Sequence, residues 1–396
     1  MKRTIFSEEH ELFRKTIREF VKKEIVPNYE QWEKDKQVPK EVYLKLGELG
    51  GLCPMAEEEY GGLEVDILFQ TIVNEEIAYE GCSGMLVPVH NDLVFPYFDR
   101  YGTKEQKEKW YPSMISGDTI TALAMSEPDA GSFLAGIKTT AVKKGNKYII
   151  NGSKTFISNG QIADLFLVAV RTKQTGLLNP DPRKGMSMVL VESDRKGFTR
   201  GKNLEKVGFH AQDTSELFFS DVEIPEENII GEVGKGWDYM MENLQIERLA
   251  IAVGCVASAH GAVDKTIEYV KERKIWKKPV SALQNTKFEL AEMSTQVELG
   301  YAMIDRILDS HMNGDDVVKE VSMAKYWCSE MNFDVSHRCM QLWGGYGYMK
   351  EYPISRWLAD SKLQMIYGGT NEVMKVLIAV SYTHLRAHET LRYLVC

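Results

Sequence analysis

The chain has 396 residues, 44% hydrophobic and 27% charged, which is an ordinary composition for a soluble globular protein. Its net charge of −9 argues against general nucleic-acid binding and against a basic helix at a membrane surface. No apolar run approaches the roughly 18 residues that cross a bilayer, so no membrane span is expected. The length suits about two or three packed units rather than one core.

The first residues lead directly into an expected helix. Ser7 is the expected N-cap, and Glu8 and Glu9 in the first turn favour the positive end of the helix dipole. No signal or transit peptide is expected before this helix, so the expected location is cytoplasmic. The 6 cysteines include no C-x-x-C pair and are expected to be free thiols, packed as small hydrophobic residues.

Two regions with different periodicity follow. Residues 1–118 carry apolar side chains at helical spacing, over 13–25 and again over 67–79, which predicts a helical N-terminal domain. Residues 119–231 contain short runs rich in β-branched and aromatic side chains: TITALAMSE, KYIINGSKTFIS, DLFLVAVRT, MSMVLVES and SELFFSDVEI. Because no helical stretch separates these runs, they predict an antiparallel barrel or sandwich rather than βαβ units.

Helical periodicity returns over residues 232–379. Three long amphipathic stretches begin at LAIAVGCV, LQNTKFEL and VVKEVSMA, and a shorter one is NEVMKVLIA. This pattern predicts an antiparallel four-helix bundle. The expected fold class is therefore multidomain α+β, with an N-terminal helical domain, a central antiparallel β-barrel or sandwich and a C-terminal helical bundle.

The last residues, 380–396, break the helical pattern of VMKVLIA. VSYTHLRAHET resembles the translation of a sequencing-library adapter, so this tail is excluded, and the native chain is expected to end a few residues beyond Ala379. His384 and His388 stand four positions apart, a spacing used by metal ligands, but no acidic partner like that of H-E-x-x-H accompanies them. No metal site is therefore expected.

Two short segments of the β region are the most informative. AMSEPDAGSF, residues 124–133, and KTFISNG, residues 154–160, place small residues and hydroxyls at expected strand ends or turns. Ser126, Ser132 and Ser158 could face a flat, polar, hydrogen-bonding ligand. Neither segment is a nicotinamide G-x-G-x-x-G or a P-loop, and each taken alone also fits an ordinary β-turn.

Together, these segments resemble the flavin-binding segments of acyl-CoA dehydrogenases. The resemblance covers roughly residues 3–379, from IFSEEHELFRKTIREF to IYGGTNEVMKVLIA, and ERKIWKK, QDTSELFF, MAKYW and GGYGYMKEYPI favour the long-chain branch. It implies non-covalent FAD and oxidation of a fatty acyl-CoA to the trans-2-enoyl-CoA. It also implies electron-transfer flavoprotein as partner and a homotetramer built as a dimer of dimers.

The resemblance also implies cofactor-binding positions. Those lining the flavin would be Leu123, Ala124, Met125, Ser126, Ser132, Phe156, Ile157 and Ser158. Those holding the FAD of a neighbouring subunit would be Arg273, Gln284, Gln341, Leu342, Trp343, Gly344 and Gly345, and the last contacts Thr370, Asn371 and Glu372. Taken alone, Arg273 and Gln284 fit a solvated helix face, whereas Gly344 and Gly345 end a helix and let backbone approach a ligand.

This chemistry needs a carboxylate that takes a proton from the α-carbon, in an apolar pocket that raises its pKa. Many family members carry this Glu immediately before G-T near the C-terminus, but here that position is Gly368. The other placement known in the family is just before an Arg on the helix after the β domain, which here is Glu247 before Arg248. Alone, the dipeptide also fits a surface charge pair; with the resemblance, Glu247 is the predicted base.

Substrate contacts are expected around this base. The predicted set is Ser132, Gln245, Ile246, Arg248, Gly368 and Gly369, and the two glycines would supply backbone room and an N–H for the thioester oxygen. The acyl tail is expected among the early helices near residues 80–92, where Gly81, Ser83 and Gly84 would leave space. The preferred chain length stays open.

Phe133 is the main departure from the family pattern, which usually has Asp after the G-S pair. Phe cannot accept hydrogen bonds from backbone N–H groups, so the loop is either held differently, with weaker FAD binding, or faces an apolar neighbour. Two alternatives to a dehydrogenase remain: an acyl-CoA oxidase that uses oxygen, and a non-catalytic acyl-CoA-binding protein of the same fold. Oxidases of this fold commonly carry an extra C-terminal helical domain, for which this chain lacks the length.

Overall fold

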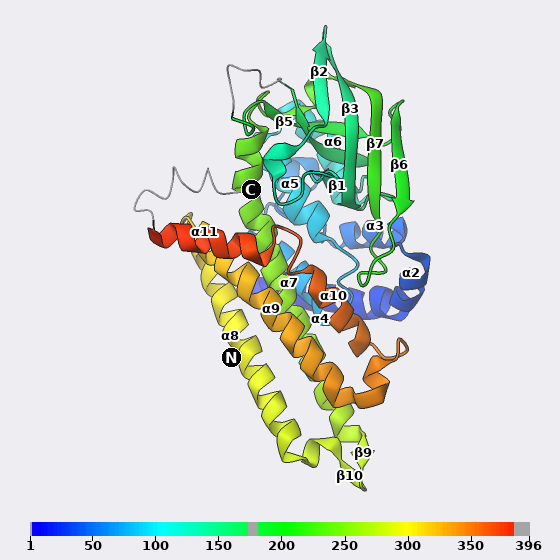
Figure 1. Cartoon of the computed structure of the whole chain (residues 1–396), viewed down its shortest axis with the longest axis vertical. Coiled ribbons are helices and arrows are strands. Elements are labelled where there is room, and N and C mark those ends of the chain that lie inside the picture. Colours follow the sequence, from blue (N-terminus) through cyan, green and yellow to red (C-terminus); the bar gives the residue numbers. More distant parts are fainter. Residues whose placement is uncertain (1, 173–180, 384–396) are drawn as a thin grey trace.

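The computed structural model describes residues 2–172 and 181–383. Its helices and strands fall into three consecutive parts: helices, then a β-sheet, then long helices (Figure 1). This order confirms the α+β organisation expected from the sequence.

The N-terminal part packs short helices around its own apolar core, and the first is capped as expected. The Ser7 side chain accepts from the backbone N–H of His10, and the His10 ring in turn bonds the Ser7 backbone N–H, a capping box. The α-helices are α1 (Glu8–Phe20), α2 (Tyr29–Asp35), α3 (Lys40–Glu48), α4 (Ile67–Tyr79), α5 (Phe95–Tyr101) and α6 (Lys104–Ser116), with π-helical turns at Val21–Ile25 and Val89–Val94.

The middle part is one 8-stranded sheet with the order β6-β7-β3-β2-β4-β5-β8, and β1 pairs with β4 off this path. The strands are β1 (Thr121–Ala124), β2 (Thr140–Lys144), β3 (Lys147–Ser158), β4 (Leu165–Arg171), β5 (Met186–Glu192), β6 (Phe198–Asn203), β7 (Thr214–Pro225) and β8 (Ile229–Ile230). β4 and β5 are buried along nearly their whole length, as their continuous apolar sequences require.

The expected antiparallel barrel or sandwich needs correction in its details. The sheet is mixed, because β1 runs parallel to β4, with Thr121 beside Leu165, and β2 meets β4 in parallel at its first residue. It does not close into a barrel, since its path ends at β6 on one side and β8 on the other. The return from β1 to β4 passes through the β2–β3 hairpin instead of a helix, so the missing crossover helix did not exclude a parallel pair.

The C-terminal part is a helical bundle: α7 (Gly236–Glu272), α8 (Gln284–Met312), α9 (Val318–Trp343), α10 (Ile354–Leu363) and α11 (Asn371–Thr383). α7, α8 and α9 run side by side, whereas α11 lies across one end of them (Figure 1). A short hairpin of β9 (Lys274–Ile275) and β10 (Lys278–Pro279) closes the opposite end.

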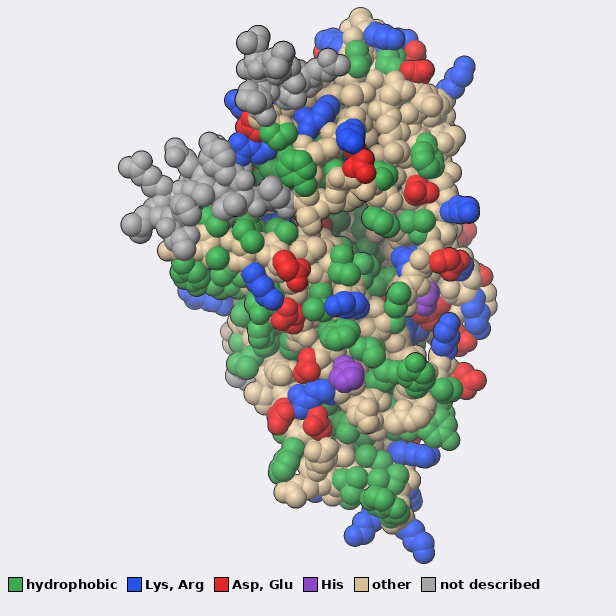
Figure 2. Space-filling model, viewed as in Figure 1, with side chains coloured by type: hydrophobic (Ala, Val, Ile, Leu, Met, Phe, Trp, Pro, Cys, Tyr) green, Lys and Arg blue, Asp and Glu red, His purple; other side chains and the backbone are tan. Residues whose placement is uncertain are grey.

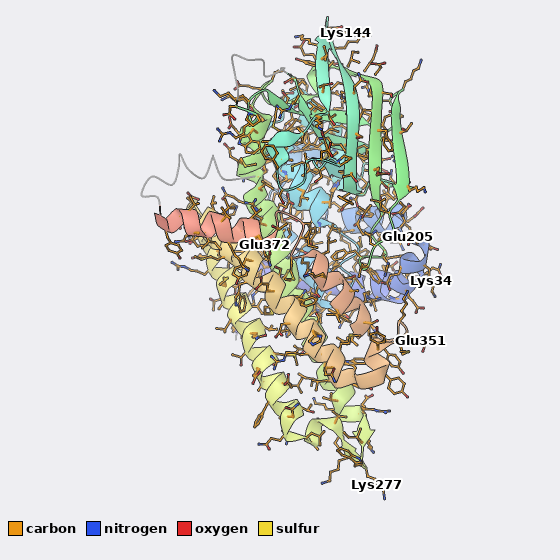
Figure 3. All side chains as sticks on the ribbon, in the orientation of Figure 1. Lys34, Lys144, Glu205, Lys277, Glu351 and Glu372 are labelled. Carbon is orange, nitrogen blue, oxygen red and sulfur yellow. The ribbon has the colours of Figure 1, made fainter. Side chains whose placement is uncertain are left out.

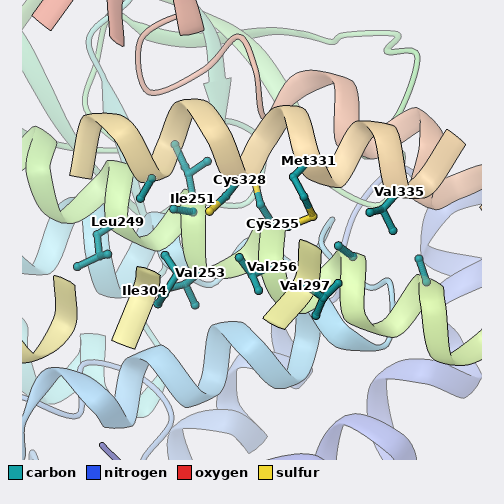
Figure 4. Packing of buried hydrophobic residues seen from close by; sticks show 14 of the residues in the cluster. Leu249, Ile251, Val253, Cys255, Val256, Val297, Ile304, Cys328, Met331 and Val335 are labelled. Carbon is teal, nitrogen blue, oxygen red and sulfur yellow. The ribbon is translucent and has the colours of Figure 1, made fainter. Parts of the chain in front are cut away.

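α7 is the central helix of the molecule, and it is more apolar than the sequence led us to expect of any segment. It is the one helix among residues 2–172 and 181–383 that is long and apolar enough to cross a membrane, although no such run was expected. In the protein, 89% of its apolar window is buried. Leu249, Ile251 and Val256 pack there against α9 and α8 (Figure 4). A helix that is apolar all round is what the core of a large domain requires.

The cysteines and the chain end bear on two further expectations. The cysteines of the described ranges, Cys53, Cys82, Cys255, Cys328 and Cys339, are all free and buried, as predicted. α11 continues to Thr383, past the expected break at Val380. His384 and His388 lie outside the described residues.

Candidate active site

The predicted base lies where α7 passes the loop between α10 and α11. On α7, Arg248 donates from Nε to the carbonyl oxygen of Gly368 at 3.0 Å. This bond ties the loop to the helix that carries Glu247. The arrangement brings Glu247, Arg248 and the two glycines together, although more than a hundred residues separate them in sequence. Figure 2 shows the molecular surface hollowed between the β domain and the bundle, with hydrophobic side chains around the hollow.

At Gly368, neighbouring atoms already occupy the space that a side chain would need. A Cβ atom at this position would lie 2.4 Å from Cδ1 of Ile251 and 3.3 Å from Oε1 of Glu247, and the residue has a φ of +63°. The Glu247 carboxylate therefore stands directly against the position from which many family members project their own Glu.

The environment of Glu247 suits a base. Glu247 is half-buried and lies between buried Ile246 and Arg248. Burial raises the pKa of Glu247 to about 6, and the charges of Arg248 and Lys325 oppose that rise. A pKa near the working pH lets one group be ionised in the resting site and accept a proton effectively.

The two flavin-side segments also come together. The backbone N–H of Thr155 donates to the carbonyl of Ser126 at 3.0 Å, and Nζ of Lys154 donates to the carbonyl of Met125 at 2.8 Å. Lys154 also forms a buried ion pair with Glu127 at 2.9 Å. The sequence did not single out this pair, because the only signal was a charged residue inside an apolar strand.

The predicted flavin-side residues differ in what they offer. Phe156 exposes 71% of its side chain and has a φ of +58°, at an irregularity in the pairing of β3 with β7. Ser132 is exposed, and Ser126 and Ser158 are half-buried. The side chains of Ala124 and Ile157 point into the core of the sheet, so they can meet a ligand only through backbone.

The second predicted cofactor set gathers at the opposite end of the bundle. A cavity of about 610 Å³ is lined by Arg273, Gln341, Leu342, Trp343, Gly344, Gly345 and neighbours, and the Arg273 guanidinium lies over the ring of Tyr346 at 5.0 Å. Gln284 begins α8 beside this cavity but is not among its lining residues. Lys277 marks this end in Figure 3, far from Glu372 at the start of α11. Along α7, Arg273 is about 39 Å beyond Glu247.

Models of three consecutive domains match this chain in order. The acyl-CoA dehydrogenase N-terminal domain matches residues 7–118, the middle domain residues 122–222 and the C-terminal domain residues 234–382. The chain belongs to the acyl-CoA dehydrogenase family. The acyl-CoA dehydrogenases of this family are FAD-dependent flavoprotein oxidoreductases.

Individual relatives agree with this placement. The mitochondrial long-chain specific acyl-CoA dehydrogenase of Mus musculus is 44% identical over 377 residues, covering 95% of this chain and 87% of the mouse protein. An acyl-CoA dehydrogenase structure from Geobacillus kaustophilus has a TM-score of 0.93 at 48% identity, covering 97% of this chain and 100% of the other. A chain from the structure of the electron transferring flavoprotein of Acidaminococcus fermentans has a TM-score of 0.91 at 31% identity, covering 96% and 99%.

The residues of this acyl-CoA dehydrogenase fit FAD at both predicted places. The segment around Ser126 and Phe156 presents the half-buried hydroxyls of Ser126 and Ser158 and the exposed ring of Phe156. At the far cavity, a Cβ atom built on Gly344 or Gly345 would have no atom within 4 Å, which leaves open space against backbone. Because the two places are far apart in one chain, one FAD molecule cannot occupy both.

Other predicted positions serve the fold instead of facing the site. Ile246 is part of the bundle core. The Asn371 amide accepts from Lys325 at 3.1 Å and donates to Ser329 at 3.0 Å, so its side chain is used inside the protein. The expected acyl-tail space at Gly81 and Gly84 is wrong, because a Cβ there would collide with the Trp357 ring and the Tyr29 hydroxyl. These glycines allow Trp357 and Tyr29 to pack closely against the backbone.

Proposed function

We propose that this acyl-CoA dehydrogenase uses Glu247 to take the α-proton of a fatty acyl-CoA. The observation that carries this proposal is the 3.3 Å approach of the Glu247 Oε1 to the Cβ position of Gly368. The glycine leaves the base position before Thr370 without a carboxylate, and Glu247 supplies one to the same place. FAD, when bound, supplies the acceptor for the hydride that leaves the β-carbon.

The remaining residues orient the substrate for that proton transfer. The α-proton is only weakly acidic, so the thioester oxygen must accept hydrogen bonds that strengthen as negative charge develops on it. We assign this to a backbone N–H of the Gly368–Gly369 loop, which Arg248 holds through the Gly368 carbonyl. Ser132 and Gln245 complete the proposed substrate contacts, Ser132 being exposed and Gln245 half-buried. The apolar surroundings of Ile251 limit water around the carboxylate.

The proposal extends to assembly and partners. The incomplete cavity at Arg273 and Gly344 suits a neighbouring subunit that brings its own FAD, as expected of a homotetramer. Likeness to a chain of an electron transferring flavoprotein structure supports an electron-transfer flavoprotein as acceptor, and bacterial relatives support a cytoplasmic location. The proposed domains are residues 1–118, 119–231 and 232–379, with a non-native tail after them.

The decisive variant is Glu247→Gln, which keeps the shape of the side chain and removes the base. We expect FAD to be retained and anaerobic flavin reduction by a long-chain acyl-CoA to slow at least about 10³-fold. The measurement is stopped-flow absorbance of the flavin after mixing with acyl-CoA.

The matched control is Glu242→Gln, which changes an exposed carboxylate on the same helix. It should reduce its flavin at the wild-type rate. A Glu247→Gln protein that still bleaches its flavin rapidly would place the base elsewhere. Reoxidation of the reduced wild-type flavin by air should be slow; fast reoxidation would favour an oxidase, and a protein purified without flavin would favour a non-catalytic role.

A further inference from the structure

Lys325 is a buried lysine on α9 that faces the loop beside the base. Its side chain is fully buried, and its ammonium group donates hydrogen bonds to neutral oxygens instead of a carboxylate. Its Nζ donates to the carbonyl oxygen of Gly369 at 2.7 Å and to Oδ1 of Asn371 at 3.1 Å. A charge taken out of water without a carboxylate partner costs several kcal/mol, so a lysine here needs a reason beyond packing.

The loop is held at two consecutive carbonyl oxygens by two cations from different helices. Arg248 on α7 binds the Gly368 carbonyl, and Lys325 on α9 binds the Gly369 carbonyl. Both glycines have positive φ values, +63° and +89°, and such residues have the least intrinsic preference for one conformation. Two charge-assisted bonds therefore fix the direction in which the loop's N–H groups point.

We propose that Lys325 is a positioning residue of this enzyme, which anchors the Gly368–Gly369 loop and whose ammonium charge keeps Glu247 ionised. The inference rests on the proposed function, since it takes Glu247 as the base. No sequence pattern pointed to it, because a lysine within MAKYW resembles any solvated helical residue.

The titratable groups that interact electrostatically with Glu247 leave Lys325 a distinct role. They are Arg248 on α7, Tyr97 on α5, Tyr367 in the loop and Lys325 on α9. Burial raises the pKa of both tyrosines well above their ordinary value, so they stay neutral while Glu247 titrates. The ionisation of Glu247 is thus governed by burial, which opposes it, and by two cations, which favour it.

The second cation is charged over the pH range in which the base titrates. Burial, with a smaller contribution from the charge of Arg248, lowers the pKa of Lys325 to about 8, and Cys255, Glu247 and Glu372 act in the opposite direction. Below pH 7 the ammonium is therefore present and stabilises the ionised form of Glu247. Removing it must raise the pKa of Glu247, so the acid limb of the pH profile should move to higher pH.

The test separates charge from anchoring with two variants, Lys325→Gln and Lys325→Met. Gln retains an N–H donor without charge, and Met retains neither. In the holoenzyme, we expect the acid limb of kcat/KM for acyl-CoA to move up by about one pH unit in both. At the pH plateau, Lys325→Met should be about tenfold slower than Lys325→Gln, because only the latter still holds the loop.

Ser329→Ala is the matched control, because Ser329 also hydrogen-bonds Asn371 from α9 but carries no charge. Its acid limb should coincide with that of the wild type. If the Lys325→Met protein does not fold, Lys325→Gln alone carries the pH test. Coincident acid limbs in Lys325→Gln and wild type would overturn the inference, whereas an active Glu247→Gln protein would overturn the base assignment instead.

Discussion

Two buried lysines, one in the β domain and one in the helical bundle, are partnered differently. Lys154, in the β domain, donates to the carbonyl of Met125 and forms an ion pair with Glu127 at 2.9 Å. Lys325, in the bundle, donates to the carbonyl of Gly369 but has only the Asn371 amide as its second acceptor. Each therefore fixes the backbone of a predicted site segment, but only Lys154 is neutralised locally.

The difference separates a structural charge from a functional one. Burial alone would raise the pKa of Glu127, but the Lys154 charge and N–H donation from Thr139 and Lys138 lower it, so the pair is ionised and self-contained. Lys325 donates only to neutral oxygens, and its charge favours the ionised form of Glu247. The Lys154–Glu127 pair should therefore govern the stability of the protein, and Lys325 should govern the pH dependence of kcat/KM.

The largest expected effect on stability is that of Lys154→Met. It removes one partner of a buried ion pair and leaves the Glu127 charge uncompensated, which costs about 3–5 kcal/mol of unfolding free energy. Chemical denaturation of the holoenzyme measures this loss. The acid limb of kcat/KM should stay where it is in the wild type.

Two further variants test whether Lys154 and Lys325 differ in this way. The double variant Lys154→Met with Glu127→Gln should recover part of the loss, because no unpaired charge remains. Lys325→Met should lose less than about 1.5 kcal/mol, since removing a buried unpaired ammonium offsets its lost hydrogen bonds. Equal losses for the two lysine variants would contradict the distinction between them.

The order of the domains could be predicted from sequence because it depends on local periodicity. The Ser7 cap and the apolar runs of β4 and β5 are local patterns, and the structure has them where they were expected. The parallel pairing of β1 with β4 was not predictable in this way, because it depends on which strands meet after the β2–β3 hairpin has formed.

The site was predictable where the resemblance reached and not beyond. Glu247 and Gly368 were named together from sequence, and the structure brings them within contact distance. Lys154 and Lys325 were not named, because charge in a sequence suggests solvent, and only tertiary packing shows that these two are buried. Gly81 and Gly84 were misjudged for the same reason: a missing side chain indicates room, but the neighbours decide whether it is filled.

A medium effect is expected from Gly368→Ala, which tests how closely the loop and the base are fitted. The left-handed backbone costs about 1–2 kcal/mol for any side chain, and the new methyl would also press on Ile251 and the Glu247 carboxylate. Flavin reduction should slow by more than the loss of folding stability can account for. Gly369→Ala is the control: its φ is also positive, at +89°, but its Cβ would face Met374 and Arg248. Equal rates in the two variants would argue that Glu247 does not need this space.

The smallest expected effect comes from Phe133→Asp, which restores the residue usual in the family on the flavin side. Phe133 stands at the start of a short 3-10 turn, Leu134–Gly136, and gives it no side-chain cap, while half of its ring is exposed. An Asp there could accept a backbone N–H and stabilise the turn by about 0.5–1 kcal/mol. Thermal release of FAD, followed by flavin fluorescence, should then occur at higher temperature.

Phe133→Asn should show most of the gain and Phe133→Ala none, because Asn can cap without charge whereas Ala cannot cap. If the Phe133→Ala and Phe133→Asp proteins release FAD at the same temperature, the flavin-side loop is held by Lys154 and Glu127 alone. The Lys154 side and the Lys325 side of the site would then differ by more than the partners of the two lysines.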